Sequence, residues 1–170
     1  MKLLAFAASN SRKSINGQLI RYATSLISNV ESEILDLNDY EMPLFSVDRE
    51  NELGIPELAH RFYNKIGAAD ALLISHAEHN GSYTVAFKNL FDWASRINGK
   101  VYQGKPLVLL ATSPGARGAS GVLATAVNSA PRFGADLKAS LSIPDFYKNF
   151  DTASGAISNP AIQTQLEETL

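Results

Sequence analysis

Continuous apolar runs alternate along the chain with segments in which apolar residues recur at helical spacing. The apolar runs occupy residues 2–7, 33–37, 71–75, 106–111 and 139–143. The helical patterns occupy about residues 15–27, 56–67, 83–96, 120–132 and 159–170. A short apolar run is typical of a strand buried on both faces, whereas a spacing of about 3.6 residues indicates an amphipathic helix. The alternation of the two patterns predicts βαβ units and a parallel sheet.

Five strands alternating with five helices over 170 residues predict an α/β, flavodoxin-like fold. We expect a single domain, residues 1–170, built on a five-stranded parallel sheet of order 2-1-3-4-5 with helices on both faces. Right-handed crossovers then bring the loops after the first, third and fourth strands to the same edge of the sheet. Open α/β sheets bind their ligands at that edge, so these three loops form the predicted site.

Local signals set the expected ends of the helices. Ser14 is the expected N-cap of the first helix, because its hydroxyl can accept from a free main-chain N–H group. Pro56 is expected to open the second helix and Gly67 to end it, while Pro160 starts the last one. The polar residues 39–54 are expected to form a long excursion between elements.

Loop one, residues 9–16, carries the hydroxyl groups of Ser9, Ser11 and Ser14 just before a predicted helix. Unpaired N–H groups and the positive end of the helix dipole make such a segment a natural phosphate site. The dinucleotide fingerprint is excluded here, because it requires glycines and residues 8–16 contain none. Loop one therefore predicts a site for a single phosphate.

The other two loops predict main-chain contacts to a ligand. Loop three, residues 76–82, contains Asn80-Gly81, which predicts a tight turn with positive φ and outward N–H groups. Loop four, residues 112–120, contains Gly115 and Gly118, which allow main-chain amides to approach a flat ligand edge. One such loop is common, but three at one sheet edge indicate a binding site.

Composition and charge exclude several other classes of protein. The chain is 45% hydrophobic and 19% charged, which is typical of a globular protein. A net charge of −2 argues against nucleic-acid binding, and the absence of cysteine excludes disulfides and thiolate nucleophiles. The first apolar run is shorter than the ~7–15 residues of a secretory signal, and no run approaches the ~20 residues of a membrane span. We therefore expect a cytoplasmic protein without membrane contact.

Three apparent motifs do not meet the requirements of their chemistry. Residues 99–106 match the spacing of a P-loop, but Pro106 stands where Ser or Thr is needed, and the segment precedes a strand. Residues 118–121 miss the G-x-S-x-G pattern of hydrolases by one position. His76 and His79 flank Glu78 at a strand end, but no third ligand can be identified to join this pair, so no metal site is expected.

At the three loops the chain resembles the NADPH-dependent FMN reductase family, which is flavodoxin-like and includes quinone, azo-dye and chromate reductases. Ser9-Asn10-Ser11-x-x-Ser14-Ile15-Asn16 resembles the family's phosphate loop. Residues 78–82, with Lys88-Asn89 and Asp92-Trp93, resemble its P-E-Y-N-G-S and K-N-x-x-D-W signatures. Residues 113–118 resemble its glycine-rich flavin loop.

The resemblance extends from Lys2 to about Phe133, with two departures in loop three. Ala77 replaces the family's usual Pro, and His79 replaces the usual Tyr. An imidazole ring offers less area for stacking on a flavin than a phenol ring does. The departures thus change the expected contact with the flavin ring and leave the pocket itself in place.

The resemblance implies FMN as cofactor and NAD(P)H as co-substrate. Hydride would pass from NAD(P)H through flavin N5 to a quinone, a free flavin or a similar small acceptor, and the flavin rather than a side chain would carry the chemistry. The implied cofactor-binding residues come from all three loops: Ser9, Ser11, Ser14, Ile15, Asn16, Glu78, His79, Asn80, Gly81, Ser113, Gly115 and Gly118.

The predicted helix 83–96 is apolar on more than one side, which indicates either deep burial or contact with a second subunit. Together with the aromatic stretch 146–150, it points to a homodimer or a dimer of dimers. Two other functions remain open from the sequence. One is a flavodoxin-type electron carrier between protein partners, against which the weak net charge argues, and the other is a flavin-free binding module.

Overall fold

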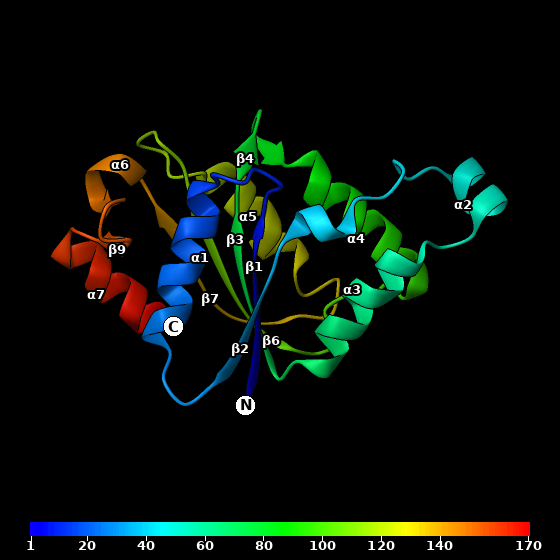
Figure 1. The fold of residues 1–170 in the computed structure, drawn as a ribbon, viewed down its shortest axis with the longest axis horizontal. Helices are drawn as coiled ribbons and strands as arrows, with labels where there is room; N and C mark the ends of the chain where they lie inside the picture. Colours follow the sequence, from blue (N-terminus) through cyan, green and yellow to red (C-terminus); the bar gives the residue numbers. More distant parts are fainter.

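A five-stranded parallel sheet of order β2-β1-β3-β6-β7 runs through the centre of the structure, a computed structural model that describes residues 1–170 (Figure 1). In chain order this is the predicted arrangement 2-1-3-4-5, so the fold class is confirmed. The strands of the sheet are β1 (Lys2–Ala8), β2 (Glu31–Leu35), β3 (Ala71–His76), β6 (Pro106–Thr112) and β7 (Asp136–Ile143).

Helices cover both faces of the sheet, as Figure 1 shows. One face carries α1 (Ile15–Leu26) and α7 (Pro160–Thr169), and the other carries α3 (Glu57–Ala68), α4 (Val85–Ile97) and α5 (Ser120–Ser129). Alternate residues of β1 enter the two cores, with Phe6 facing α3 and α4 and Ala5 facing α1. Burial on both faces explains why this strand reads as a continuous apolar run. No helix is both long and apolar enough to cross a membrane.

Several element ends differ from the sequence-based expectation. Strand β2 begins at Glu31 rather than at residue 33 and ends at Leu35, because as an edge strand it is exposed over most of its length and carries little apolar pattern. Helix α3 does not end at Gly67. A Cβ on Gly67 would lie 2.9 Å from Gln103 Oε1, so this glycine permits close packing instead of stopping the helix.

The excursion after β2 contains helical structure that the sequence pattern did not predict. A 3₁₀ helix, η1 (Leu37–Tyr40), follows β2 and buries Leu37 and Tyr40 in the core. Helix α2 (Val47–Leu53) begins at the N-cap Ser46 and has no buried residue. Because α2 packs no apolar face, hydrophobic spacing could not reveal it.

The C-terminal region adds a short helix and a hairpin after β7. These are α6 (Phe146–Asn149), β8 (Phe150–Asp151) and β9 (Ala156–Ile157). The rings of Phe146 and Phe150 stack at 4.6 Å inside the protein, so these aromatic residues belong to the chain's own core. Helix α4 is likewise buried on its apolar sides, although Val85 is 68% exposed.

Candidate functional site

The carboxyl ends of β1, β3 and β6 lie side by side, with Ala8, His76 and Ala111 in register. Loops one, three and four therefore meet at one edge of the sheet, as predicted. Hydrogen bonds from side chains also join the loops to one another. The loops form one structural unit rather than three independent segments.

Asn16 is the centre of this connection. Its side chain is buried and makes three hydrogen bonds: Nδ2 donates to Thr112 O at 3.1 Å, and Oδ1 accepts from Thr112 N at 3.1 Å and from Ser75 Oγ at 2.7 Å. Both polar atoms of the Asn16 side chain are thus used within the protein. Because the side chain is buried and bonded to Ser75 and Thr112, a phosphate contact of Asn16 would come from its main-chain N–H group, which has no acceptor.

Thr84 connects loop three to the end of β1. Its hydroxyl donates to Ala8 O at 2.9 Å and accepts from Phe87 N at 3.2 Å as the N-cap of α4. No local pattern marks Thr84 as part of the site, because its partner lies 76 positions away in the chain. The residue fixes the entry of α4 beside loop one.

Loop one forms a cradle of hydrogen-bond donors at the start of α1. Ser14 caps this helix by accepting from Gly17 N at 3.2 Å, which confirms the predicted cap. The main-chain N–H groups of four residues have no acceptor in the structure: Arg12, Lys13, Ile15 and Asn16. The exposed Ser11 hydroxyl lines a cavity of about 130 Å³ beside them, together with Ser9 and Ser14. Free N–H groups and hydroxyls at a helix N-terminus suit a phosphate group.

Loop three is a two-residue hairpin between β4 (Glu78–His79) and β5 (Ser82–Tyr83). Asn80 has φ +52° and Gly81 has φ +77°, so the predicted tight turn with positive φ is confirmed. The main-chain N–H groups of Asn80 and Gly81 have no acceptor. The hairpin therefore presents two donors at the sheet edge.

Glu78 fastens loop three to the first turn of α5. Helix α5 begins after Ala119, which has no side chain capable of capping it. Glu78 Oε2 supplies the missing acceptor by receiving a hydrogen bond from Val122 N at 2.9 Å. Gly121 allows this approach, since a Cβ there would lie 3.0 Å from the same carboxylate oxygen. A negative charge at a helix N-terminus is favourable, so Glu78 positions loops three and four together.

Loop four is supported from below by the segment after β7. Asp145 N donates to Gly115 O and Phe146 N donates to Ser113 O, at 3.0 and 3.1 Å. Gly118 is buried and presses against the end of β7, whereas Gly115 is exposed and has open space around it. The N–H groups of Gly115 and the following Ala116 have no acceptor and lie at the exposed part of the loop.

A second cavity, of about 350 Å³, opens between loop one, loop three and the segment after β2. We call it the His79 cavity. Its lining includes Asn10 of loop one, His79 of loop three and the first turn of α4, while Leu37 to Leu44 supply the opposite wall. The sequence pattern predicts only an excursion for most of this segment and does not reveal its place at the site.

His76, the last residue of β3, lies below this site and not in it. Its ring is fully buried against the rings of Tyr83 and Phe87, with centroids 5.3 and 5.0 Å away, and neither ring nitrogen has a hydrogen-bond partner. Burial lowers the pKa of His76 to about 3, which keeps the ring neutral. His79 is exposed on the hairpin, and no group of three possible metal ligands is present.

The buried His76 predicts a specific loss of stability in acid. Because the folded-state pKa is about 3 and the unfolded value is 6.5, the unfolded chain gains a proton first as the pH falls below 6.5. Between pH 6.5 and 4.5 we expect a loss of about 2–3 kcal/mol of unfolding free energy from this residue. Urea unfolding of the wild type and of His76→Leu at both pH values measures this loss. An unchanged pH dependence in the variant would contradict the assignment.

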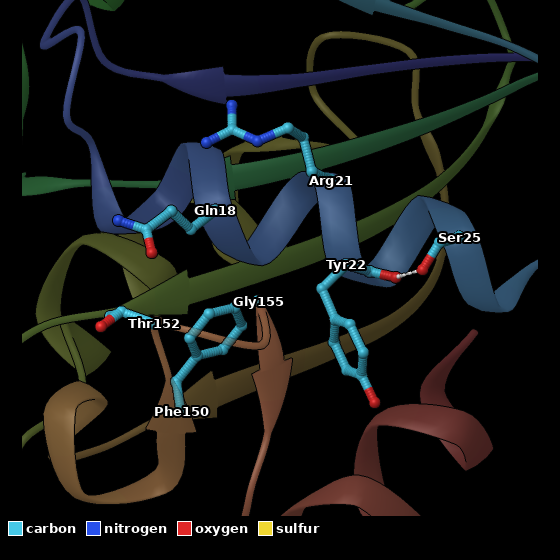
Figure 2. Close-up of a pocket in the computed structure, with 7 residues that line it drawn as sticks. All are labelled: Gln18, Arg21, Tyr22, Ser25, Phe150, Thr152 and Gly155. Carbon is cyan, nitrogen blue, oxygen red and sulfur yellow. Dashed lines mark hydrogen bonds between the residues drawn. The ribbon is translucent and has the colours of Figure 1, made fainter.

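The largest cavity lies apart from the three loops, between α1 and the C-terminal hairpin. It measures about 580 Å³ and is open to solvent. Figure 2 shows Tyr22 of α1 and Phe150 of β8 flanking it, with Gln18 and Arg21 projecting from the same helix. None of its lining residues belongs to the loops that the sequence identified.

Comparison with known proteins agrees with this geometry. The model of the NADPH-dependent FMN reductase family matches residues 1–140. A 2-hydroxy-1,4-benzoquinone reductase from a Burkholderia species is 38% identical over 120 residues, which make up 69% of this chain and 63% of that protein. The chain therefore spans less than two thirds of the length of this curated relative.

Two solved structures extend the comparison to nearly the whole chain. The flavoenzyme NAD(P)H:(acceptor) oxidoreductase from Paracoccus denitrificans has a TM-score of 0.76 at 26% identity, covering 98% of this chain and 91% of that chain. A mutant of flavodoxin from Pseudomonas aeruginosa has a TM-score of 0.60 at 16% identity, covering 99% and 95%, and shares the fold. With a family match over residues 1–140, which include all three loops, this chain belongs to the NADPH-dependent FMN reductase family.

Proposed function

We propose that the protein is an FMN-dependent NAD(P)H oxidoreductase acting on a small acceptor such as a quinone or a free flavin. The observation that carries the proposal is the loop-one cradle. It joins four unused main-chain N–H groups with the hydroxyls of Ser9, Ser11 and Ser14 at the N-terminus of α1. Its place beside loops three and four matches a ligand with a phosphate at one end and a flat ring at the other.

In this proposal the residues divide by the part of FMN that they hold. Loop one binds the phosphate through Ser9, Ser11 and Ser14 and through the N–H groups of Ile15 and Asn16. Loops three and four border the ribityl chain and the ring: Glu78, His79, Asn80, Gly81, Ser113, Gly115 and Gly118. Bound FMN supplies hydride transfer, for which no protein side chain offers an equivalent group.

The protein's electrostatic contribution comes from main-chain donors. The free N–H groups of Asn80, Gly81 and Gly115 lie at the sheet edge, where they would donate to the oxygen-rich edge of the flavin ring. Fixed donors at a place where negative charge develops lower the free energy of the charged state. The side chains of Asn16 and Glu78 also act indirectly, by fixing the loops that carry these donors.

The His79 cavity is the proposed entry for NAD(P)H and then for the acceptor. It adjoins loop one and loop three, and its lining combines apolar side chains such as Met42 and Val85 with the His79 ring. A half-apolar cavity of about 350 Å³ suits a small planar molecule. We place this activity in the cytoplasm, with no nucleic-acid partner.

We also propose that the protein forms a homodimer or a dimer of dimers. Two exposed apolar side chains lie near the start of α4: Leu44 is 58% and Val85 is 68% exposed. Leu44 and Val85 both line one shallow groove there, which supports this face as the contact. Sedimentation of the wild type and of a Val85→Lys variant tests it.

Ser11→Ala tests the proposed phosphate site with little risk to the fold. The Ser11 hydroxyl is exposed and makes no hydrogen bond within the protein. A hydrogen bond to a charged group contributes about 1.5–3 kcal/mol, so the FMN Kd should rise roughly 10- to 100-fold. Flavin-fluorescence titration measures it, with riboflavin as the matched ligand because it lacks the phosphate.

Riboflavin affinity should be the same in the wild type and in Ser11→Ala. Ser25→Ala, which removes a hydroxyl bonded to Tyr22 O further along α1, should leave the FMN Kd unchanged. Equal FMN affinity in Ser11→Ala and the wild type would contradict the phosphate assignment. Slow NADPH oxidation by an FMN-loaded protein, with and without a quinone, would favour an electron carrier instead.

A further inference from the structure

The wall of the His79 cavity opposite loop three is a segment without regular secondary structure. Residues 41–46 lie between η1 and α2 and belong to no helix or strand. Met42 and Leu44 from this segment line the cavity directly. A wall of this kind keeps its shape only if something outside the segment holds it.

Side chains provide that support, because the main chain of residues 42–45 makes no hydrogen bond to another main-chain group. Asn89 of α4 accepts from Phe45 N at 2.8 Å and donates to Met42 O and to Pro43 O, both at 3.2 Å. Trp93, one turn further along α4, donates from its indole nitrogen to Pro43 O at 2.7 Å. Both residues belong to the K-N-x-x-D-W signature.

The two supporting residues are themselves well anchored. Trp93 is fully buried, and its ring packs edge-to-face against Phe45 at 5.1 Å. Arg96, the next residue on the same face of α4, lies 5.8 Å from the Phe45 ring and pairs with Glu50 of α2. The wall is thus attached to α4 at several points, and α4 begins at the site itself.

We propose that Asn89 and Trp93 are positioning residues that set the width of the His79 cavity and thereby the choice of acceptor. This inference rests on the proposed function for its substrate. Neither residue lines the cavity of the loop-one cradle, so their effect falls on the second substrate and not on the binding of FMN. Asn89 also lines the His79 cavity itself, whereas Trp93 acts on it only through the wall. Loss of these hydrogen bonds lets the wall move and widens the cavity. The affinity for a small quinone then falls more than the affinity for a large one.

Two graded variants test the proposal. Trp93→Phe keeps an aromatic ring in the core but removes the donor to Pro43 O together with part of the buried indole ring. Asn89→Ala removes three hydrogen bonds to the wall. For a contribution of roughly 1 kcal/mol per hydrogen bond, the KM for 1,4-benzoquinone should rise about 5-fold in the first variant and up to about 150-fold in the second. The kcat and the FMN Kd should change less than about 2-fold.

The ratio of the kcat/KM values for two quinones distinguishes a change in cavity width from a general loss of activity. The kcat/KM for 1,4-benzoquinone relative to that for the larger menadione should fall in both variants. Ser95→Ala is the matched control, because its hydroxyl bonds only to Asp92 O within α4. An equal loss for both quinones, or an FMN Kd that rises along with the quinone KM, would overturn the proposal.

Limited proteolysis gives a readout that does not depend on activity. Arg49 lies in α2 just beyond the supported segment and donates from its guanidinium to Leu44 O, so it is tied to the wall. Trypsin cleaves after arginine only where the chain can open. Cleavage after Arg49 should be about 5-fold faster or more in Asn89→Ala and unchanged in Ser95→Ala. Equal cleavage rates would overturn the role in holding the wall. If the wild type binds no FMN while this difference persists, the proposed function fails and the support of the wall stands.

Discussion

Asn16→Leu should lower the free energy of unfolding by about 4 kcal/mol, because it leaves three buried polar groups without partners at about 1–3 kcal/mol each. These groups are the Ser75 hydroxyl and the main-chain N–H and C=O of Thr112, and both residues are at most 1% exposed. Leucine has a shape similar to asparagine, so the loss reports hydrogen bonding rather than a cavity. Urea unfolding measures it.

The same substitution should weaken FMN binding, since Asn16 joins loop one to the start of loop four. Gln18→Leu is the matched control, because Gln18 is an amide on the same helix with no hydrogen bond from its side chain, and it should change stability by less than about 0.5 kcal/mol. Ser75→Ala should lower the free energy of unfolding less in the Asn16→Leu background than in the wild type. The reason is that the Ser75 hydroxyl has already lost its partner in Asn16→Leu. Strict additivity would contradict the network.

The sheet order, the meeting of the three loops and the turn at Asn80-Gly81 could all be predicted from local patterns. Each depends on a signal within a few residues: an apolar run, a helical stripe or a dipeptide with a preference for positive φ. The N-cap Ser14 is predictable for the same reason, since its partner is Gly17. The fold follows from such signals because burial on both faces leaves a strong pattern in the central strands.

The roles of Asn16 and Glu78 could not be predicted in this way. The sequence placed both residues at the site, but their partners lie 96 and 44 positions away along the chain. Nothing within one element distinguishes a side chain that contacts a ligand from one that fastens two loops. The same limit hid the cavity wall at residues 41–46, where Pro43 and the absence of a regular hydrophobic period indicate a loop, and only the contacts with α4 show why the segment is ordered.

Gly118→Ala should lower the free energy of unfolding by about 3 kcal/mol, from two causes that act at the same position. Gly118 has φ +57°, a conformation that costs a residue with a Cβ about 1–2 kcal/mol. A Cβ there would also lie 2.5 Å from Ser142 Oγ and 2.9 Å from main-chain atoms of Ile143 and Pro144. Because the main chain cannot move aside as a side chain can, loop four must shift at a further cost of about 1–3 kcal/mol.

Two other glycines of the site separate these causes. Gly81 has φ +77° and nothing within 4 Å of the place that a Cβ would take, so Gly81→Ala should show only the conformational cost, about 1 kcal/mol. Gly115 has open space and no positive φ, and Gly115→Ala should change stability by less than about 0.5 kcal/mol. A loss of unfolding free energy that decreases from Gly118→Ala to Gly81→Ala to Gly115→Ala would support the packing of loop four against the end of β7. Urea unfolding measures these losses. If Gly118→Ala were no worse than Gly81→Ala, the end of β7 would not constrain the loop, and Gly118 would be needed only for its backbone conformation.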